Sequence, residues 1–279
     1  MQVSPSGFFA WRKRLSVPPK IRRQTTAQLV KSSYLENRRR YGSRRIVAEL
    51  RRKGEGVGRY KVRRLMREQG LQAIRPKRFV PKTTDSSQTK SVSPNLLKRA
   101  AKTGEPTTPG SVIIGDITYL PLRNGKWCYL AMWQDKRTRR IVGWQVGETM
   151  TVGLVIKALQ QAIKNELVQA GAIVHTDRGS QYAATEFRAL LGRHHLQQSM
   201  SAKGNCYDNA QAESWFSRFK SELVEGGVFD DCEQARSEAF SYIEGYYNRQ
   251  RLHSGLGYKT PLEFEKELRE KEREKKERV

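Results

Sequence analysis

Residues 111–120, Ser-Val-Ile-Ile-Gly-Asp-Ile-Thr-Tyr-Leu, restrict the fold of this chain more than any other stretch. Apolar residues fill both alternating sets of positions, which is typical of a strand covered on both faces at the centre of a sheet. One carboxylate, Asp116, interrupts the run. We therefore expect an α/β domain in which this strand is central and holds Asp116 mid-strand or near its end.

The elements that follow this strand extend the prediction. Asn124-Gly125 is typical of a hairpin turn between two strands. Hydrophobic periodicity then predicts strands over 127–134, 140–146, 172–175 and 196–200, and helices over 151–170, 180–192, 232–247 and around Glu213. Three antiparallel strands followed by alternating helices and strands are the order of a ribonuclease-H-like fold with a mixed five-stranded sheet.

Charge separates a second module from this domain. Residues 1–80 hold 23 Lys and Arg against 4 acids, so +19 of the net +25 lies there. Such a balance favours a polyanionic partner, most simply nucleic acid. An acidic membrane surface is the alternative, but no stretch combines a clean apolar face with basic charge strongly enough to prefer it.

Residues 1–75 are expected to form an all-α helix-turn-helix module that binds DNA. Residues 4–20 look like an irregular basic arm with a Pro-Pro stop, and a helix is expected over 23–37. Ser43 can cap a helix that runs to about Lys53, and a second helix over 59–69 would end at Gly70. The candidate DNA contacts are Arg44, Arg45, Arg59, Lys61, Arg63 and Arg64. The alternative is a basic helical hairpin that packs on the rest of the chain.

The remaining segments complete the domain prediction. Residues 76–110 are rich in Pro, Ser, Thr and Lys and are expected to be a linker, whereas 111–262 are expected to form the α/β core with its C-terminal helices. Residues 263–279 are expected to be a charged tail, most simply a solvated helix. The three cysteines are too scattered for a disulfide framework or zinc cluster. Without a signal peptide or long apolar run, a cytoplasmic protein is expected.

Three acids are placed where a metal site for phosphoryl transfer needs them. Asp116 lies in the first strand, Asp177 follows the strand over 172–175, and Glu213 lies in the first turns of a helix. Carboxylate oxygens suit Mg²⁺ or Mn²⁺, and two such ions about 4 Å apart can assist in-line displacement at phosphorus. Any one acid alone would more simply be a cap or an ion-pair partner.

Neighbouring polar residues form a wider set of candidates. Lys220 lies seven residues after Glu213, so both side chains leave the same face of the helix. His175 is expected to position the site or to pack, and Arg251 and His253 are candidates to reach phosphate. Asn205, Asp208 and Asn209 either shape the loop before the Glu213 helix or contact DNA, with Asp208 as a helix cap.

Long motifs resemble the DDE integrase-type transposases of bacterial insertion sequences, in particular the OrfB-type product, whose core is related to retroviral integrases. They are Gly115-Asp-Ile-Thr-Tyr119, His175-Thr-Asp-Arg-Gly-Ser-Gln-Tyr182 and the Gly204–Ser214 stretch that contains Glu213. Residues 40–46 and 62–71 resemble the family's N-terminal segment, and 246–261 its C-terminal signature. Gly115 and Thr176 depart from the family's usual residues.

The resemblance implies a reaction and partners. Asp116, Asp177 and Glu213 would be the metal-binding triad, Lys220 would contact the transposon end, and no covalent protein–DNA intermediate would form. The expected partners are the element's terminal inverted repeats, target DNA, further copies of the chain on DNA, and the upstream-frame (OrfA-type) protein, often as a fusion. A bacterial cytoplasmic, nucleoid-associated location follows. The rivals are a nuclease without strand transfer and a DNA-binding regulator with an inert core.

Overall fold

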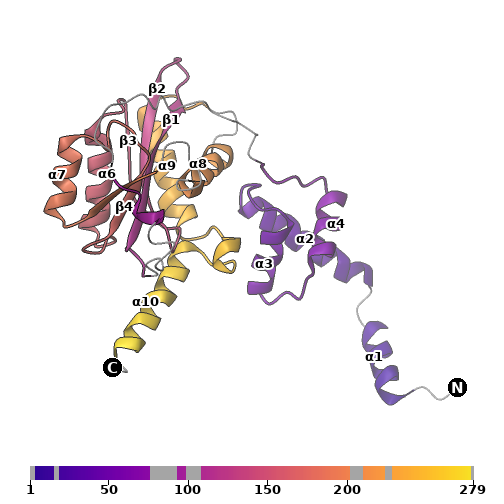
Figure 1. The fold of residues 1–279 in the computed structure, drawn as a ribbon. Helices are drawn as coiled ribbons and strands as arrows, with labels where there is room; N and C mark the ends of the chain where they lie inside the picture. Colours follow the sequence, from indigo (N-terminus) through magenta and orange to yellow (C-terminus); the bar gives the residue numbers. More distant parts are fainter. Residues whose placement is uncertain are drawn as a thin grey trace. The chain divides into compact units, whose positions relative to one another are not determined.

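The computed structural model describes residues 4–15, 19–75, 93–98, 108–201, 210–223 and 228–277. The chain divides into two compact units, Met1–Arg75 and Pro76–Val279 (Figure 1). None of the helices in these described ranges is long and apolar enough to cross a membrane.

The first unit opens with two helices, α1 (Pro5–Leu15) and α2 (Pro19–Glu36). The prediction of an irregular arm over residues 4–20 is therefore wrong. Ser4 starts α1 as a cap, because its Oγ accepts a hydrogen bond from the Gly7 N–H at 3.2 Å. Pro5 and Pro19 each take the first position of a helix. A backbone N–H at this position has no partner within the helix, so proline loses no hydrogen bond there. Pro19 thus marks a helix start rather than a stop.

The helix-turn-helix pair follows as α3 (Ser43–Arg52) and α4 (Arg59–Glu68). Each helix buries the predicted apolar face, and both pack on α2. Gly42, not Ser43, is the N-cap of α3, and it offers no side-chain bond. Gly70 ends α4 as predicted: its φ is +65°, and the following Leu71 N–H donates to the Met66 carbonyl at 2.8 Å.

The second unit is built on a mixed five-stranded sheet in the order β3-β2-β1-β4-β5, which confirms the predicted fold class. An antiparallel meander forms one half: β1 (Val112–Pro121), β2 (Trp127–Asp135) and β3 (Ile141–Gly147). The short strands β4 (Ile173–Thr176) and β5 (Gln197–Met200) extend it in parallel. The Asp116 strand is therefore the central strand, as its two apolar faces predict.

Helices cover both faces of the sheet (Figure 1). Two helices, α6 (Val152–Lys164) and α7 (Thr185–Arg193), lie on one face, and α8 (Ala210–Leu223) and α9 (Cys232–Phe240) lie on the other. The α6 side holds a core centred on Trp133, which is 1% exposed. Glycine at position 115, directly across from Trp133 in the sheet, leaves room for this ring.

Two helix boundaries differ from the prediction. The helix expected to reach residue 170 ends at Lys164, because Glu166 turns left-handed and the Leu167 N–H bonds back to the Ala162 carbonyl at 3.0 Å. Leu167 still packs on the core after this turn, which is why its spacing imitates a continuing helix. The helix expected from residue 180 begins only at Thr185, after a turn.

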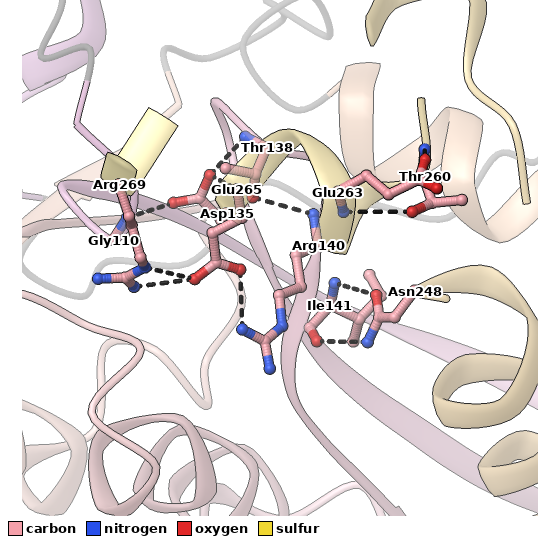
Figure 2. Close-up of polar contacts among 10 residues, drawn as sticks. All are labelled: Gly110, Asp135, Thr138, Arg140, Ile141, Asn248, Thr260, Glu263, Glu265 and Arg269. Carbon is pink, nitrogen blue, oxygen red and sulfur yellow. Dashed lines mark hydrogen bonds and ion pairs between the residues drawn. The ribbon is translucent and has the colours of Figure 1, made fainter. Parts of the chain in front are cut away.

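The C-terminal segments pack against β3 and the end of β2. After α9 the chain winds as a π-helix, η2 (Ser241–Tyr247). Asn248 then exchanges two 3.0 Å hydrogen bonds with the backbone of Ile141, one donated and one accepted (Figure 2). The predicted helix over 232–247 is thus present, with a wider final section.

The charged tail belongs to α10 (Pro261–Glu277), whose first turns bury one face that includes Pro261 and Glu265. Thr260 and Glu263 form a capping box, with bonds of 2.9 and 3.2 Å between each backbone N–H and the other's side chain. Buried Glu265 accepts from Arg140 at 2.8 Å and from Arg269 at 2.9 Å (Figure 2). The ion pair with Arg140 holds the tail to the start of β3.

Candidate active site

Asp116 lies at the middle of β1, opposite Met132 of β2. The residue is half-buried, and its carboxylate accepts the N–H of Ile117 at 2.8 Å. Ile114 and Leu120, two and four residues away on the same face, are fully buried beneath the α8 and α9 layer. The sheet thus holds one carboxylate within an otherwise apolar face.

Asp177 stands beside Asp116 because of the strand register. The parallel ladder pairs Val112 with Ile173 and Ile114 with His175, so the same offset continued by two residues pairs Asp116 with Asp177. Neighbouring strands lie about 4.8 Å apart. The Asp177 carboxylate accepts the N–H of Gly179 at 2.9 Å. A Cβ at Gly179 would stand 3.0 Å from that same oxygen, so a larger residue here would press on the carboxylate.

Glu213 and Lys220 come from α8, which packs on β1, and both are exposed. Their charges shift the pKa of Asp116. The pKa of Asp116 is raised to about 8, first by burial, then by Asp177 and to a smaller extent by Glu213, whereas Lys220 lowers it. Burial also raises the pKa of Asp177 and lowers that of Lys220. Two strands and one helix therefore gather three acids and a cation into one electrostatic site.

The donors suit a divalent cation. Crowded carboxylates hold a proton because their negative charges repel each other, and a cation would remove that repulsion. Asp116 and Asp177 form the close pair. Within the described residues, no three His, Cys, Asp or Glu side chains converge closely enough to hold one ion. Glu213 therefore lies near enough to raise the pKa of Asp116 but does not converge with the two aspartates as a third ligand.

Comparisons with known proteins cover nearly the whole chain. A family described as an HTH-like domain matches residues 21–79, and two described as integrase core domains match residues 106–206 and 194–261. An uncharacterized 31 kDa protein of insertion element IS600 from Shigella sonnei is 40% identical over 94% of this chain and 94% of its own length. The InsF transposase of IS3A from Escherichia coli K12 is 38% identical over 95% of this chain and 91% of its own. This chain belongs to the insertion-sequence transposases with an integrase core.

Other comparisons concern further relatives and solved structures. The transposase of element IS904 from Lactococcus lactis is 39% identical over 88% of this chain and 95% of its own length. Among solved structures, the catalytic core of BIV integrase aligns with a TM-score of 0.45 and 18% identity, over 58% of this chain and 98% of that one.

His175 of this transposase lies beneath the site rather than in it. The side chain is fully buried, and its two ring nitrogens bond to Ser199 at 2.8 Å and Ser201 at 3.2 Å. These bonds join β4 to β5 and to the residue after β5, two residues before Asp177. They are compatible with either expected role, positioning of the site or packing. The loop candidates Asn205, Asp208 and Asn209 lie outside the described residues.

The basic candidates of the N-terminal unit divide by orientation. Arg44, Arg59, Arg63 and Arg64 are exposed. Arg45 stacks over the Tyr41 ring at 5.6 Å, and Lys61 turns inward to donate to the Thr26 hydroxyl at 3.1 Å. Sequence reasoning missed Tyr60, which is 82% exposed between Arg59 and Lys61 on α4. An aromatic residue at an outward helix position among arginines is the signal that could have found it.

Arg251 and His253 do not reach phosphate, so that prediction is wrong. Arg251 is 1% exposed and forms an ion pair with Glu222 of α8. His253 is buried against the Tyr247 ring, with centroids 4.9 Å apart. The periodic pattern places these residues after a helix but does not tell whether their polar ends point inward. Gln211, in the first turn of α8, donates its side-chain N–H to the Lys136 carbonyl at 3.1 Å.

Proposed function

We propose that this transposase cuts DNA at the ends of its own insertion element and joins them to target DNA, with Asp116, Asp177 and Glu213 as its metal-binding triad. The observation that carries the proposal is the parallel register that sets Asp116 beside Asp177, with α8 bringing Glu213 to the same site. Paired aspartates, one in the middle of the central strand β1 and one directly after the adjacent strand β4, suit phosphoryl transfer.

The three acids would hold Mg²⁺ or Mn²⁺, as two ions. When bound, the ions assist the attacking water or 3′-hydroxyl and neutralise charge on the leaving oxygen. The chain positions the ligands: the Gly179 N–H orients Asp177, and the sheet fixes Asp116. Because the pKa of Asp116 is raised to about 8, ion binding must displace a proton at neutral pH.

Lys220 would bind the element end. Its side chain leaves α8 on the same face as Glu213, about 10 Å further along the helix. No ion pair within the described part of the chain engages its ammonium group. Glu222, the nearby acid that could have paired with it, points to the opposite side and binds Arg251. Lys220 is therefore available to the DNA backbone next to the scissile phosphate.

The N-terminal unit would recognise DNA through the exposed arginines of α3 and α4. Further copies of the chain on the terminal repeats, and the upstream-frame protein as a separate chain or fusion, would complete the active assembly. Because its substrate is chromosomal DNA, the transposase would act in the bacterial cytoplasm at the nucleoid. No membrane partner is proposed.

The test uses labelled duplexes that carry the terminal repeats found in the DNA flanking the gene. The parent protein should cut and join them in Mg²⁺ or Mn²⁺. The variants Asp116→Asn, Asp177→Asn and Glu213→Gln should each lose activity by about a thousandfold or more, which corresponds to several kcal/mol of barrier. Glu186→Gln is the matched control, because Glu186 is also an exposed first-turn glutamate, on α7.

The outcomes separate the rival functions. Cleavage without joined products would indicate a nuclease, and binding without cleavage under any metal condition would indicate a regulator. If a triad variant keeps full activity, that residue does not belong to the site. Loss of activity in Glu186→Gln would show that glutamate removal acts through the fold.

A further inference from the structure

A buried charge cluster lies on α8 opposite the active site. The Glu222 carboxylate accepts hydrogen bonds from Arg251 Nε at 2.9 Å and from the Tyr242 hydroxyl at 2.9 Å, and it pairs with Arg251 Nη2. Glu222 and Arg251 side chains are only 6% and 1% exposed. A bidentate guanidinium–carboxylate contact fixes the relative orientation of the two side chains as well as their distance. This cluster therefore ties α8 to the chain after η2.

Helix geometry places this cluster on the far side of α8 from the reactive groups. Glu222 follows Glu213 by nine residues, which at about 100° per residue is half a turn away. Lys220 lies within about 20° of Glu213 by the same count. The exposure agrees, since Glu213 and Lys220 are exposed while Glu222 is buried. Any rotation of α8 that moved Glu213 would have to break the contact at Glu222.

Apolar packing alone leaves that rotation less well defined. The inward face of α8 meets η2 through aromatic rings: Trp215 and Phe219 contact Tyr242 at centroid distances of 6.4 and 5.2 Å. The hydrophobic effect that buries these rings is non-directional, so buried apolar area alone does not select one rotation of the helix. Glu222 adds a directional contact from the same buried face. The cluster lies nine residues beyond Glu213, near the end of α8 at Leu223.

We propose that Glu222 and Arg251 are positioning residues that fix the rotation of α8, so that Glu213 meets Asp116 and Asp177 and Lys220 faces the element end. The inference rests on the proposed function, because it assigns Glu213 to the metal site. It gives the C-terminal signature over 246–261 a purpose: Arg251 acts through α8 and touches neither DNA nor metal. A buried ion pair can be replaced by apolar residues with little loss of stability, which makes this role separable from folding.

The test replaces both charges together, as Glu222→Met with Arg251→Met. We expect the melting temperature to stay close to that of the parent protein. The Mg²⁺ concentration for half-maximal cleavage of labelled element ends should rise about tenfold, because residues that orient metal ligands typically carry an effect of that size. Arg251→Lys keeps the charge but not the two-pronged contact, and it should shift the Mg²⁺ midpoint in the same direction by a smaller factor.

The matched control is Arg140→Met with Glu265→Met. This pair is also largely buried, at 22% and 7% side-chain exposure, but it anchors α10 rather than α8. It should leave the Mg²⁺ midpoint unchanged. A folded Glu222→Met/Arg251→Met protein with the parent's midpoint and rate would overturn the proposal. If the double variant does not fold, an unchanged midpoint in folded Arg251→Lys does the same. A parent protein that fails to cleave at all contradicts the proposed function instead.

Discussion

Replacement of Gly115 by alanine tests how tightly the strand that holds Asp116 is packed. An added Cβ would stand 2.1, 2.4 and 2.6 Å from three ring atoms of Trp133. Ordinary contacts begin at 3.4 Å, so the ring or the strand must shift by about 1.3 Å. The methyl group therefore has no place in the present packing.

The Trp133 ring has little freedom to move away. It stacks on Phe187 with centroids 5.9 Å apart and planes 7° apart, and its Nε1 donates to the Val155 carbonyl at 3.2 Å. Overpacking of a core costs about 1–3 kcal/mol, and a lost hydrogen bond about 1 kcal/mol. Alanine loses less backbone entropy on folding than glycine does, and this difference offsets less than about 1 kcal/mol of the packing cost. Gly115→Ala should lower the free energy of unfolding by about 3 kcal/mol.

Urea and thermal unfolding of the purified protein measure this effect. A unit of this size should lose about 6–12 °C of melting temperature for 3 kcal/mol. Gly192→Ala is the control, because a Cβ there meets no atom within 4 Å and should stabilise α7 slightly. In the Gly115→Ala background, Trp133→Leu should lower the free energy of unfolding by less than it does in the parent protein. Equal melting temperatures for Gly115→Ala and parent, or strictly additive effects of the two substitutions, would refute the reasoning.

Three further predictions concern charge. Lys220→Ala should weaken binding and joining of element ends, measured by gel shift and joining assays, far more than it lowers the melting temperature. Lys157→Ala, at an exposed position on α6, is the control in the same assays. If the two variants bind and join element ends equally well, Lys220 belongs to the scaffold. A fragment of residues 1–75, which is a compact unit, should bind DNA by itself. For each tenfold rise in salt concentration, the logarithm of its association constant should fall by about 0.9 per phosphate contacted. An affinity that does not depend on salt would contradict this. Burial beside Asp177 raises the pKa of Asp116 from 3.8 to about 8, so the metal-free folded state keeps a proton that the unfolded state has lost. Stability should therefore fall as pH rises from about 4 to about 8, by less than the roughly 6 kcal/mol that the full shift would give, because the carboxylate is partly exposed to solvent. Asp116→Asn should flatten this fall in thermal melts at pH 5 and pH 8, and an undiminished slope would count against it.

The strands and most helices could be predicted from local pattern, because burial on one or both faces imposes a period on the apolar residues. The errors lie where a local signal has two meanings. Ser4-Pro5 and Pro19 were interpreted as irregular chain although a cap followed by proline also begins a helix. Leu167 kept helical spacing after the helix had ended, because it packs on the same core from a left-handed turn.

The sequence by itself determined the acids, the strands and helix that hold them, the separate basic module and the family. Only the tertiary structure decided which side chains meet. Asp116 and Asp177 are neighbours through a parallel register between strands about sixty residues apart, and local periodicity contains no information on such a pairing. Arg251 looked like a phosphate ligand and is instead a buried partner of Glu222. The direction of a charged side chain depends on which elements bury it, and that is set by the packing of the whole unit.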